Sequence, residues 1–274
     1  MRALSLATAG LVALTLHASA QQPARKAPPK ARTPAPAARP APAPRVEATV
    51  PFAVGETLTY DVAWSNYMVA GSAVTRVVEK RPSSNSTAYY IVAEGKPIPL
   101  VERFYSVYYK MDSLLDSFSS LSQRTSLYTE EGAAKRYATT QYNRSTKRAS
   151  FEWKAGTQTM KDELVIPANV QDGLSALYTL RGRAFRSGER ISVPVTDDGT
   201  LYTVNFDVGA PEPIKVPLGP VTAWNLRVTI LDATNQSIGN NVRAWISTDT
   251  RRLPVRLQAD LPVGNFALAL RSAQ

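Results

Sequence analysis

The sequence predicts a mainly β fold, a large curved antiparallel sheet or half-open barrel around one principal helix. Two observations predict it. After residue 51 most of the chain consists of short runs in which apolar and polar residues alternate, separated by turn residues. Only residues 167–183 have a helical pattern. Because no second linker interrupts residues 51–274, we expect these elements to form a single β-rich domain.

The principal helix is predicted at about residues 170–182. Asn169 is suited to be its N-cap, and Asp172 would place a carboxylate in the first turn. At 100° per residue the apolar side chains cover more than half of the circumference, so the helix is expected to be mostly buried. Gly182 is expected to end it as a left-handed C-cap.

Arg181 falls in the middle of this apolar arc. An unpaired guanidinium is too costly to bury, so we expect a carboxylate, several backbone carbonyls or a bound anionic group to face it. The sequence is compatible with two roles for Arg181, a structural ion pair or the recognition of an anion.

The strands are expected in a regular succession. Runs between residues 123 and 166 are separated by turns at 130–132, 143–146 and 155–156, which predicts an antiparallel meander. Further strands are expected at 57–64, 72–78, 89–93, 190–195, 201–208, 221–231, 242–247, 253–261 and 265–270. A transmembrane barrel fits poorly, because prolines recur between residues 194 and 254.

Residues 103–111 hold the densest group of aromatic residues in the chain. Tyr105 and Tyr109 share one face of the predicted strand, and Phe104 and Tyr108 share the other. Both faces are apolar enough to be covered. The strand is either a central one, packed by core and by cross-strand aromatic pairs, or, together with Trp64, the wall of an apolar ligand cavity.

Residues 1–20 have the composition of a secretory signal peptide. Arg2 precedes an apolar run at 3–16, and Ala18 and Ala20 form a small-residue cleavage site. We therefore expect an exported protein, in the periplasm of a bacterium. The chain has no cysteine to carry a lipid anchor, and no later run is long enough for a transmembrane helix, so we expect it to be neither lipidated nor transmembrane.

Residues 21–50 are predicted to form a disordered basic arm rich in proline and alanine. They hold eight of the twenty prolines. Their six basic residues and one acidic residue give them half of the net charge of +10. The arm is either a spacer or an electrostatic contact to an anionic membrane or the cell wall. The rest of the chain is only mildly basic, so no nucleic-acid partner is expected.

The only histidine, His17, lies in the predicted signal peptide, so the mature chain would contain neither histidine nor cysteine. This excludes Ser-His-Asp and Cys-His catalysis and the usual zinc sites. No catalytic residue, metal site or cofactor is predicted, and we expect the protein not to be an enzyme. Hydrolysis by carboxylates or by a Ser-Lys pair is the least favoured alternative.

Two segments, residues 170–181 (VQDGLSALYTLR) and 245–255 (WISTDTRRLPV), occur together with an opening at 54–60 (VGETLTY) and with Ala70 and Gly71. In these segments the chain resembles the bacterial family called domain of unknown function 3108, over about residues 52–270. The resemblance implies an exported envelope protein of β-rich fold and supplies no catalytic residues. A curved sheet enclosing a helix is also similar to bacterial lipoprotein carriers, by an analogy of fold alone.

Two hypotheses for function are favoured. The first is a protein that binds an apolar or amphiphilic envelope molecule, such as a lipid, in the curved sheet, with Arg181, Trp64, Tyr105 and Tyr109 as ligand-binding residues. The second is a structural or scaffolding module that contacts other envelope proteins through a sheet edge or through the charged turn at 249–252. Its contact residues would be Asp249, Arg251 and Arg252; Asp249 is expected to cap the turn and both arginines to point to water.

Overall fold

The computed structural model describes residues 45–65, 68–104, 106–261 and 264–274, which form one compact unit. The predicted signal peptide and most of the predicted arm lie outside the described residues. The strands are β1 (Thr57–Trp64), β2 (Met68–Ser83), β3 (Ser86–Pro97), β4 (Val107–Asp116), β5 (Ser122–Glu131), β6 (Ala134–Asn143), β7 (Arg148–Ala155), β8 (Gln158–Val165), β9 (Gln171–Asp172), β10 (Arg190–Asp197), β11 (Thr200–Val216), β12 (Gly219–Leu231), β13 (Ser237–Ser247), β14 (Pro254–Leu261) and β15 (Gly264–Ala273). The helices are α1 (Pro99–Glu102) and α2 (Gly173–Arg181).

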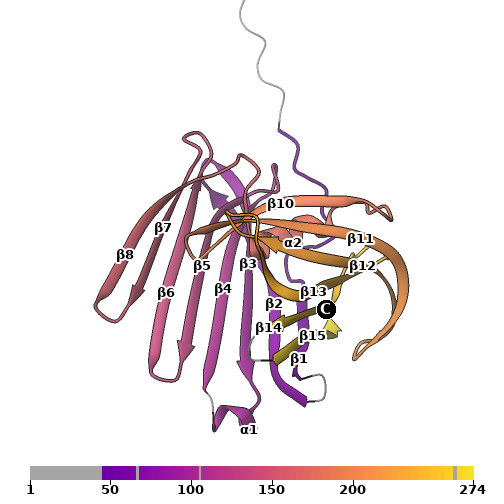
Figure 1. Cartoon of the computed structure of the whole chain (residues 1–274). Coiled ribbons are helices and arrows are strands. Elements are labelled where there is room, and N and C mark those ends of the chain that lie inside the picture. Colours follow the sequence, from indigo (N-terminus) through magenta and orange to yellow (C-terminus); the bar gives the residue numbers. More distant parts are fainter. Residues whose placement is uncertain (1–44, 66–67, 105, 262–263) are drawn as a thin grey trace, which may run out of the picture. The chain divides into compact units, whose positions relative to one another are not determined.

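All fifteen strands belong to one curved sheet (Figure 1). Apart from β8 and β9, strands that follow each other in the chain are neighbours in the sheet, and β1 pairs with β15, so the first and last strands lie side by side. The sheet is not closed: its two edges are β8 and β9, which are consecutive in the chain. Every pairing is antiparallel except that of β9 with β10. The predicted large, open, antiparallel sheet is therefore confirmed. The described residues contain, beside the predicted principal helix, the four-residue helix α1.

Helix α2 lies on the concave face and joins the two main parts of the core. Leu174 and Tyr178 pack in a cluster with side chains of β2, β3 and β4, and Leu180 packs in a second cluster with side chains of β10 to β13. Six of its nine residues are buried. The predicted burial of the helix is confirmed, because its apolar side chains pack in both clusters.

The two ends of α2 differ from the sequence prediction. Asp172 is the N-cap, and its carboxylate accepts a hydrogen bond from the Ser175 N–H at 2.8 Å. Asn169 lies before the short strand β9 and is exposed, so it cannot cap the helix. Gly182 has φ −74°, a right-handed conformation, because the chain continues into a tighter turn in which the Gly182 and Arg183 N–H groups bond to Thr179 and Leu180 carbonyls.

The tip of the β10–β11 hairpin packs against β6 and β7 through side chains and does not pair with β8. The hydroxyls of Tyr142 and Thr196 are hydrogen bonded at 2.6 Å, and Arg136 forms a bidentate ion pair with Asp198. Gly199 has φ +75°, and a Cβ there would lie 2.8 Å from the Phe151 ring. Only glycine fits this contact, which brings the two halves of the sheet together.

Two predicted segments differ in extent. The aromatic strand begins at Val107, after α1, and Phe104 is 86% exposed, so the prediction that both faces are covered is wrong there. The proline-spaced segment after residue 208 continues β11 as far as Val216. Pro211 and Pro213 are tolerated because β10 pairs only with residues 200–207, which leaves this part of β11 at an edge where no ladder N–H is needed.

Candidate functional site

Arg181 is completely buried and is held by protein groups. Its Nη1 and Nη2 donate to the two carboxylate oxygens of Glu56 at 2.6 and 2.8 Å. Nε donates to the Arg252 carbonyl at 3.0 Å, and Nη2 donates also to the Arg251 carbonyl at 3.1 Å. A ligand could reach this guanidinium only by displacing Glu56, because no part of the side chain is exposed.

The three sequence segments that carry the family resemblance meet at this ion pair. Residues 54–60 supply the Glu56 carboxylate, 170–181 end on Arg181, and 245–255 supply the two carbonyls. These segments belong to the start of β1, the end of α2 and the β13–β14 turn. The ion pair therefore fixes the helix end against both the first strand and the distant hairpin.

Aromatic rings complete the surroundings of Arg181. Its guanidinium carbon lies 4.9 Å from the ring centroid of Tyr178 and 5.4 Å from that of Phe52. Burial raises the pKa of Tyr178 to about 12 and also raises the pKa of Tyr60. The Tyr60 hydroxyl is buried without a hydrogen-bond partner. Both phenols thus stay neutral, and Glu56 alone balances the charge of Arg181 in this core.

Beyond the buried core, the concave face carries a row of apolar side chains, all but one of which remain partly exposed. They lie directly opposite one another on six successive strands, β3 to β8: Ala93, Met111, Leu127, Ala138, Trp153 and Met160. Met111 and Ala93 pack against the cluster that contains Leu174 and Tyr178, so the row faces the helix side of the sheet. Ala138 is buried, the other five are at least partly exposed, and Met160 at the edge is 43% exposed.

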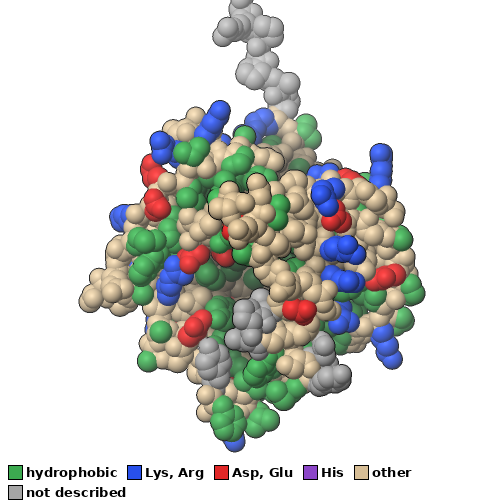
Figure 2. All heavy atoms as spheres, in the orientation of Figure 1, with side chains coloured by type: hydrophobic (Ala, Val, Ile, Leu, Met, Phe, Trp, Pro, Cys, Tyr) green, Lys and Arg blue, Asp and Glu red, His purple; other side chains and the backbone are tan. Residues whose placement is uncertain are grey.

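The opposite wall of the concave face is also apolar and only half-buried. Val62, Leu268 and Leu257 lie opposite one another on β1, β15 and β14. Farther from the helix, the rings of Trp64 and Phe266 are stacked with centroids 6.3 Å apart. Figure 2 shows a hollow in the middle of this face, between the part of the sheet that ends in β8 and the part that contains β11 to β13.

A polar row borders the apolar one on the side away from α2. Tyr109, Thr129 and Arg136 lie opposite one another on β4, β5 and β6. The Tyr109 hydroxyl donates to Glu131 at 2.5 Å, and the Arg136 guanidinium lies 5.1 Å from the Trp153 ring. The concave face thus changes from buried core to half-open apolar row to polar rim.

The predicted ligand-binding residues do not form one group. Trp64 and Tyr109 line the concave face at 41% and 40% exposure, on opposite walls. Arg181 lies behind them in the ion pair with Glu56, and Tyr105 lies outside the described residues. Sequence reasoning missed the apolar row on β5 to β8, although the register of the predicted meander places these residues opposite one another. It also missed Glu56, for which the sequence holds no local signal.

The predicted partner-binding turn has a well-defined backbone. Asp249 caps it as expected, accepting from the Arg251 and Arg252 N–H groups at 3.1 Å and from the Ser247 hydroxyl at 2.8 Å. Arg251 is exposed, whereas Arg252 is only partly so and lies 5.9 Å from the Phe185 ring. The expectation that both arginines point to water is therefore corrected for Arg252. Partner binding by this turn stays a prediction.

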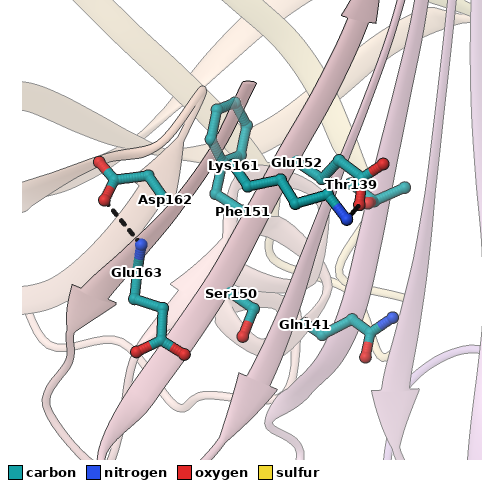
Figure 3. A pocket seen from close by; sticks show the side chains of 8 residues that line it. All are labelled: Thr139, Gln141, Ser150, Phe151, Glu152, Lys161, Asp162 and Glu163. Atoms are coloured by element: carbon teal, nitrogen blue, oxygen red, sulfur yellow. Dashed lines mark hydrogen bonds and ion pairs between the residues drawn. The ribbon is translucent and has the colours of Figure 1, made fainter. Parts of the chain in front are cut away.

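Two surface depressions lie away from α2. The larger, about 540 Å³, is lined by side chains of β6, β7 and β8, most of them polar, including the Glu152–Lys161 ion pair (Figure 3). The smaller, about 240 Å³, is lined by Asp207, Val208, Gly209, Asn225, Arg227 and Arg243. Among the described residues, no group of three or more histidine, cysteine, aspartate and glutamate side chains is arranged to hold a metal. No helix there is long and apolar enough to cross a membrane.

The fold is similar to those of solved structures at low sequence identity. A β-barrel-like protein of domain of unknown function DUF1849 from Brucella abortus matches with a TM-score of 0.52 and 11% identity, over 81% of this chain and 97% of that one. A candidate lipoprotein from Parabacteroides distasonis matches with a TM-score of 0.34 and 9% identity, over 84% of this chain and 100% of that one. The first shows a shared fold alone; the second is too distant to support an argument.

The sequence comparisons agree with the resemblance seen in the motifs. No curated protein matches the chain. The family described as protein of unknown function (DUF3108) matches residues 59–271, a range that contains α2, the β13–β14 turn and all the strands that form the concave face. The match covers most of the chain, and the chain therefore belongs to the DUF3108 family.

Proposed function

We propose that this protein is an exported, non-enzymatic envelope protein that binds an apolar or amphiphilic molecule on the concave face of its sheet. The predicted signal peptide supports export to the periplasm, and a mature chain without histidine or cysteine supports binding rather than catalysis. The carrying observation is the apolar row from Ala93 to Met160, which continues the core and in which every side chain except Ala138 keeps exposed surface.

Physical chemistry favours an occupant for this row. Each Å² of apolar surface removed from water stabilises a complex by about 25 cal/mol. Large contiguous apolar patches on the surfaces of monomeric proteins usually mark binding sites. The tip of the β10–β11 hairpin contacts Tyr142 and Arg136 of β6 and Phe151 of β7, and Ala138 is buried there, whereas Met111, Leu127, Trp153 and Met160 keep exposed surface. A bound apolar chain would complete the burial that these elements leave unfinished.

The border of the apolar row favours an amphiphile over a purely apolar ligand. Arg136, which is ion-paired with Asp198, and the Tyr109–Glu131 pair lie on the side of the row away from the helix. An acyl or similar chain along the apolar row would bring its polar head near these groups. They include a cationic hydrogen-bond donor and an anionic acceptor. The buried Arg181 is not needed for this mode of binding.

Binding of an environment-sensitive apolar probe, N-phenyl-1-naphthylamine, tests the proposal. Met111→Gln and Leu127→Gln each place an amide in the apolar row, and we expect the affinity for the probe to fall about tenfold, since roughly 1.4 kcal/mol of apolar contact is lost. Val165→Gln is the matched control, because Val165 is a 70% exposed apolar residue of β8 outside the row. Equal affinity of all three variants, with circular dichroism spectra like that of the wild type, would count against the concave face as the site.

A further inference from the structure

Strand β8 is a sheet edge, and among the described residues no other strand covers it. It pairs with β7 in an uninterrupted register from Arg148–Val165 to Ala155–Gln158, without a bulge, and contains no proline. Seven of its eight residues are exposed, on both faces of the sheet. In the described part of the chain no strand pairs with its other side. Such an edge presents a row of backbone N–H and C=O groups to any strand that fits it.

The rest of the fold cannot cover this edge. The β10–β11 hairpin is engaged through Thr196, Asp198 and Gly199 with the concave side of β6 and β7. The opposite edge, β9, is only two residues long, and both Gln171 and Asp172 are buried. A head-to-tail pairing of β8 with β9 of another molecule is therefore excluded, and a two-fold contact of β8 with itself is the closed arrangement that remains.

We propose that β8 pairs antiparallel with β8 of a second copy of this chain, across a two-fold axis at Asp162. Residues directly opposite in an antiparallel pair project from the same face. This register places Lys161 opposite Glu163 twice on one face and Met160 opposite Leu164 twice on the other. The sequence of β8 is thus complementary to itself in both charge and polarity.

The neighbouring registers are disfavoured by like charges. An axis at Lys161 would place two lysines opposite each other, and an axis at Glu163 would place two glutamates opposite each other, both of which destabilise a strand pair. The axis at Asp162 also brings two aspartates together, one from each copy. That repulsion limits the affinity, so the dimer forms reversibly and depends on concentration.

The dimer would extend the apolar row. Met160 ends the row at the edge of one copy, and Leu164 of the second copy lies opposite it. This inference does not rest on ligand binding, because it depends only on the edge and the charges of β8. It specifies the sheet-edge contact that a scaffolding role would require.

Sedimentation velocity over about two orders of magnitude in protein concentration tests the dimer. We expect Lys161→Glu to weaken dimerisation about tenfold or more, because two opposite-charge pairs become two like-charge pairs. The double variant Lys161→Glu with Glu163→Lys exchanges the charges and restores dimerisation. Asp162→Asn removes the repulsion at the axis and strengthens the dimer beyond the wild type.

Lys154→Glu is the matched control, because Lys154 is an exposed lysine that also pairs with Glu152 but belongs to β7 and not to the edge. It leaves the dimer unchanged. The proposal is overturned if wild type and Asp162→Asn both remain monomeric at the highest concentration. It is also overturned if Lys161→Glu and Lys154→Glu behave alike, or if the exchanged pair fails to restore the dimer.

Discussion

At the scale of single residues, the Arg181–Glu56 pair shows how a buried charge is tolerated. Removing both ions from water is costly, and their attraction offsets that cost only with good geometry and further hydrogen bonds. Here the guanidinium makes four hydrogen bonds, two of them to one carboxylate. That a partner must face Arg181 followed from its place in the apolar arc. The identity of that partner did not, because Glu56 lies 125 residues away in the chain.

Replacing Arg181 or both members of the ion pair tests whether their attraction offsets the cost of burying the two charges. Arg181→Met leaves the Glu56 carboxylate buried and unpaired, and we expect a loss of about 3–5 kcal/mol in the free energy of unfolding. Adding Glu56→Leu removes that carboxylate and should recover part of the loss, but not the part due to the Arg251 and Arg252 carbonyls. Urea unfolding measures both. If Arg181→Met lowers the free energy of unfolding by less than about 1 kcal/mol, the ion pair is not needed for stability.

Asp116 gives the fold a dependence on acid. Burial by itself raises the pKa of this carboxyl, but the neighbouring Ser86 hydroxyl, together with hydrogen bonds from the Ser119 N–H and hydroxyl and from the Phe118 N–H, outweighs it and lowers the pKa from 3.8 to about 2. A lowered folded-state pKa stabilises the fold above the unfolded value. That stabilisation, about 2 kcal/mol, is lost as the pH falls from about 4 through about 2.

Comparison with Asp116→Asn isolates this carboxylate. We expect the variant to be about 2 kcal/mol less stable than the wild type at neutral pH, and the difference to shrink as the pH falls below about 4. Urea unfolding at a series of pH values measures the difference. A difference that stays constant from neutral pH down to the acid limb would mean that the charge of Asp116 does not contribute.

At the scale of elements, the helix shows which signals are local and which are not. Its place and its burial followed from the spacing of apolar residues, but its start did not. Asn169 and Asp172 are both good N-caps by type. Asp172 is used because β9 carries residues 171 and 172 beside β10, and because the Ser113 hydroxyl donates to the Asp172 carboxylate at 2.7 Å. These are tertiary contacts that no local pattern contains.

The choice of cap can be tested by paired substitutions. Asp172→Ala leaves the buried Ser175 N–H without its acceptor and removes the carboxylate that accepts from the Ser113 hydroxyl, and we expect it to cost about 2–4 kcal/mol in the free energy of unfolding. Asn169→Ala changes an exposed side chain and should stay within about 0.5 kcal/mol of the wild type. Thermal unfolding of both variants decides between the two caps, and equal effects would contradict the assignment.

Some features of the strands were also predictable from local sequence, and others were not. The meander of β5 to β8 was predicted almost as observed, because each hairpin has its turn residues and its alternation within a few positions of chain. The continuation of β11 through Pro211 and Pro213 could not be predicted, since prolines are admissible there only because that part of the strand lacks a neighbour on one side. The β8 edge likewise becomes visible only when the strand order is known.

At the scale of the whole molecule, a sheet whose strands follow chain order is left open between two consecutive strands. Helix α2 and the β10–β11 hairpin fill part of the concave face and leave every side chain of the apolar row except Ala138 at least partly exposed. The curved open sheet around a helix was predictable from the alternation of strands and the single long helix. The row from Ala93 to Met160 was not, because it depends on the register of six strands at once.

Native mass spectrometry of the protein purified from the periplasm of a bacterial host, without detergent, tests the central claim most directly. The account predicts a bound species of lipid or other amphiphile mass, which is depleted in Leu127→Gln and retained in Val165→Gln. A wild-type spectrum that contains only the bare protein, together with failure of added fatty acid to bind, would contradict it.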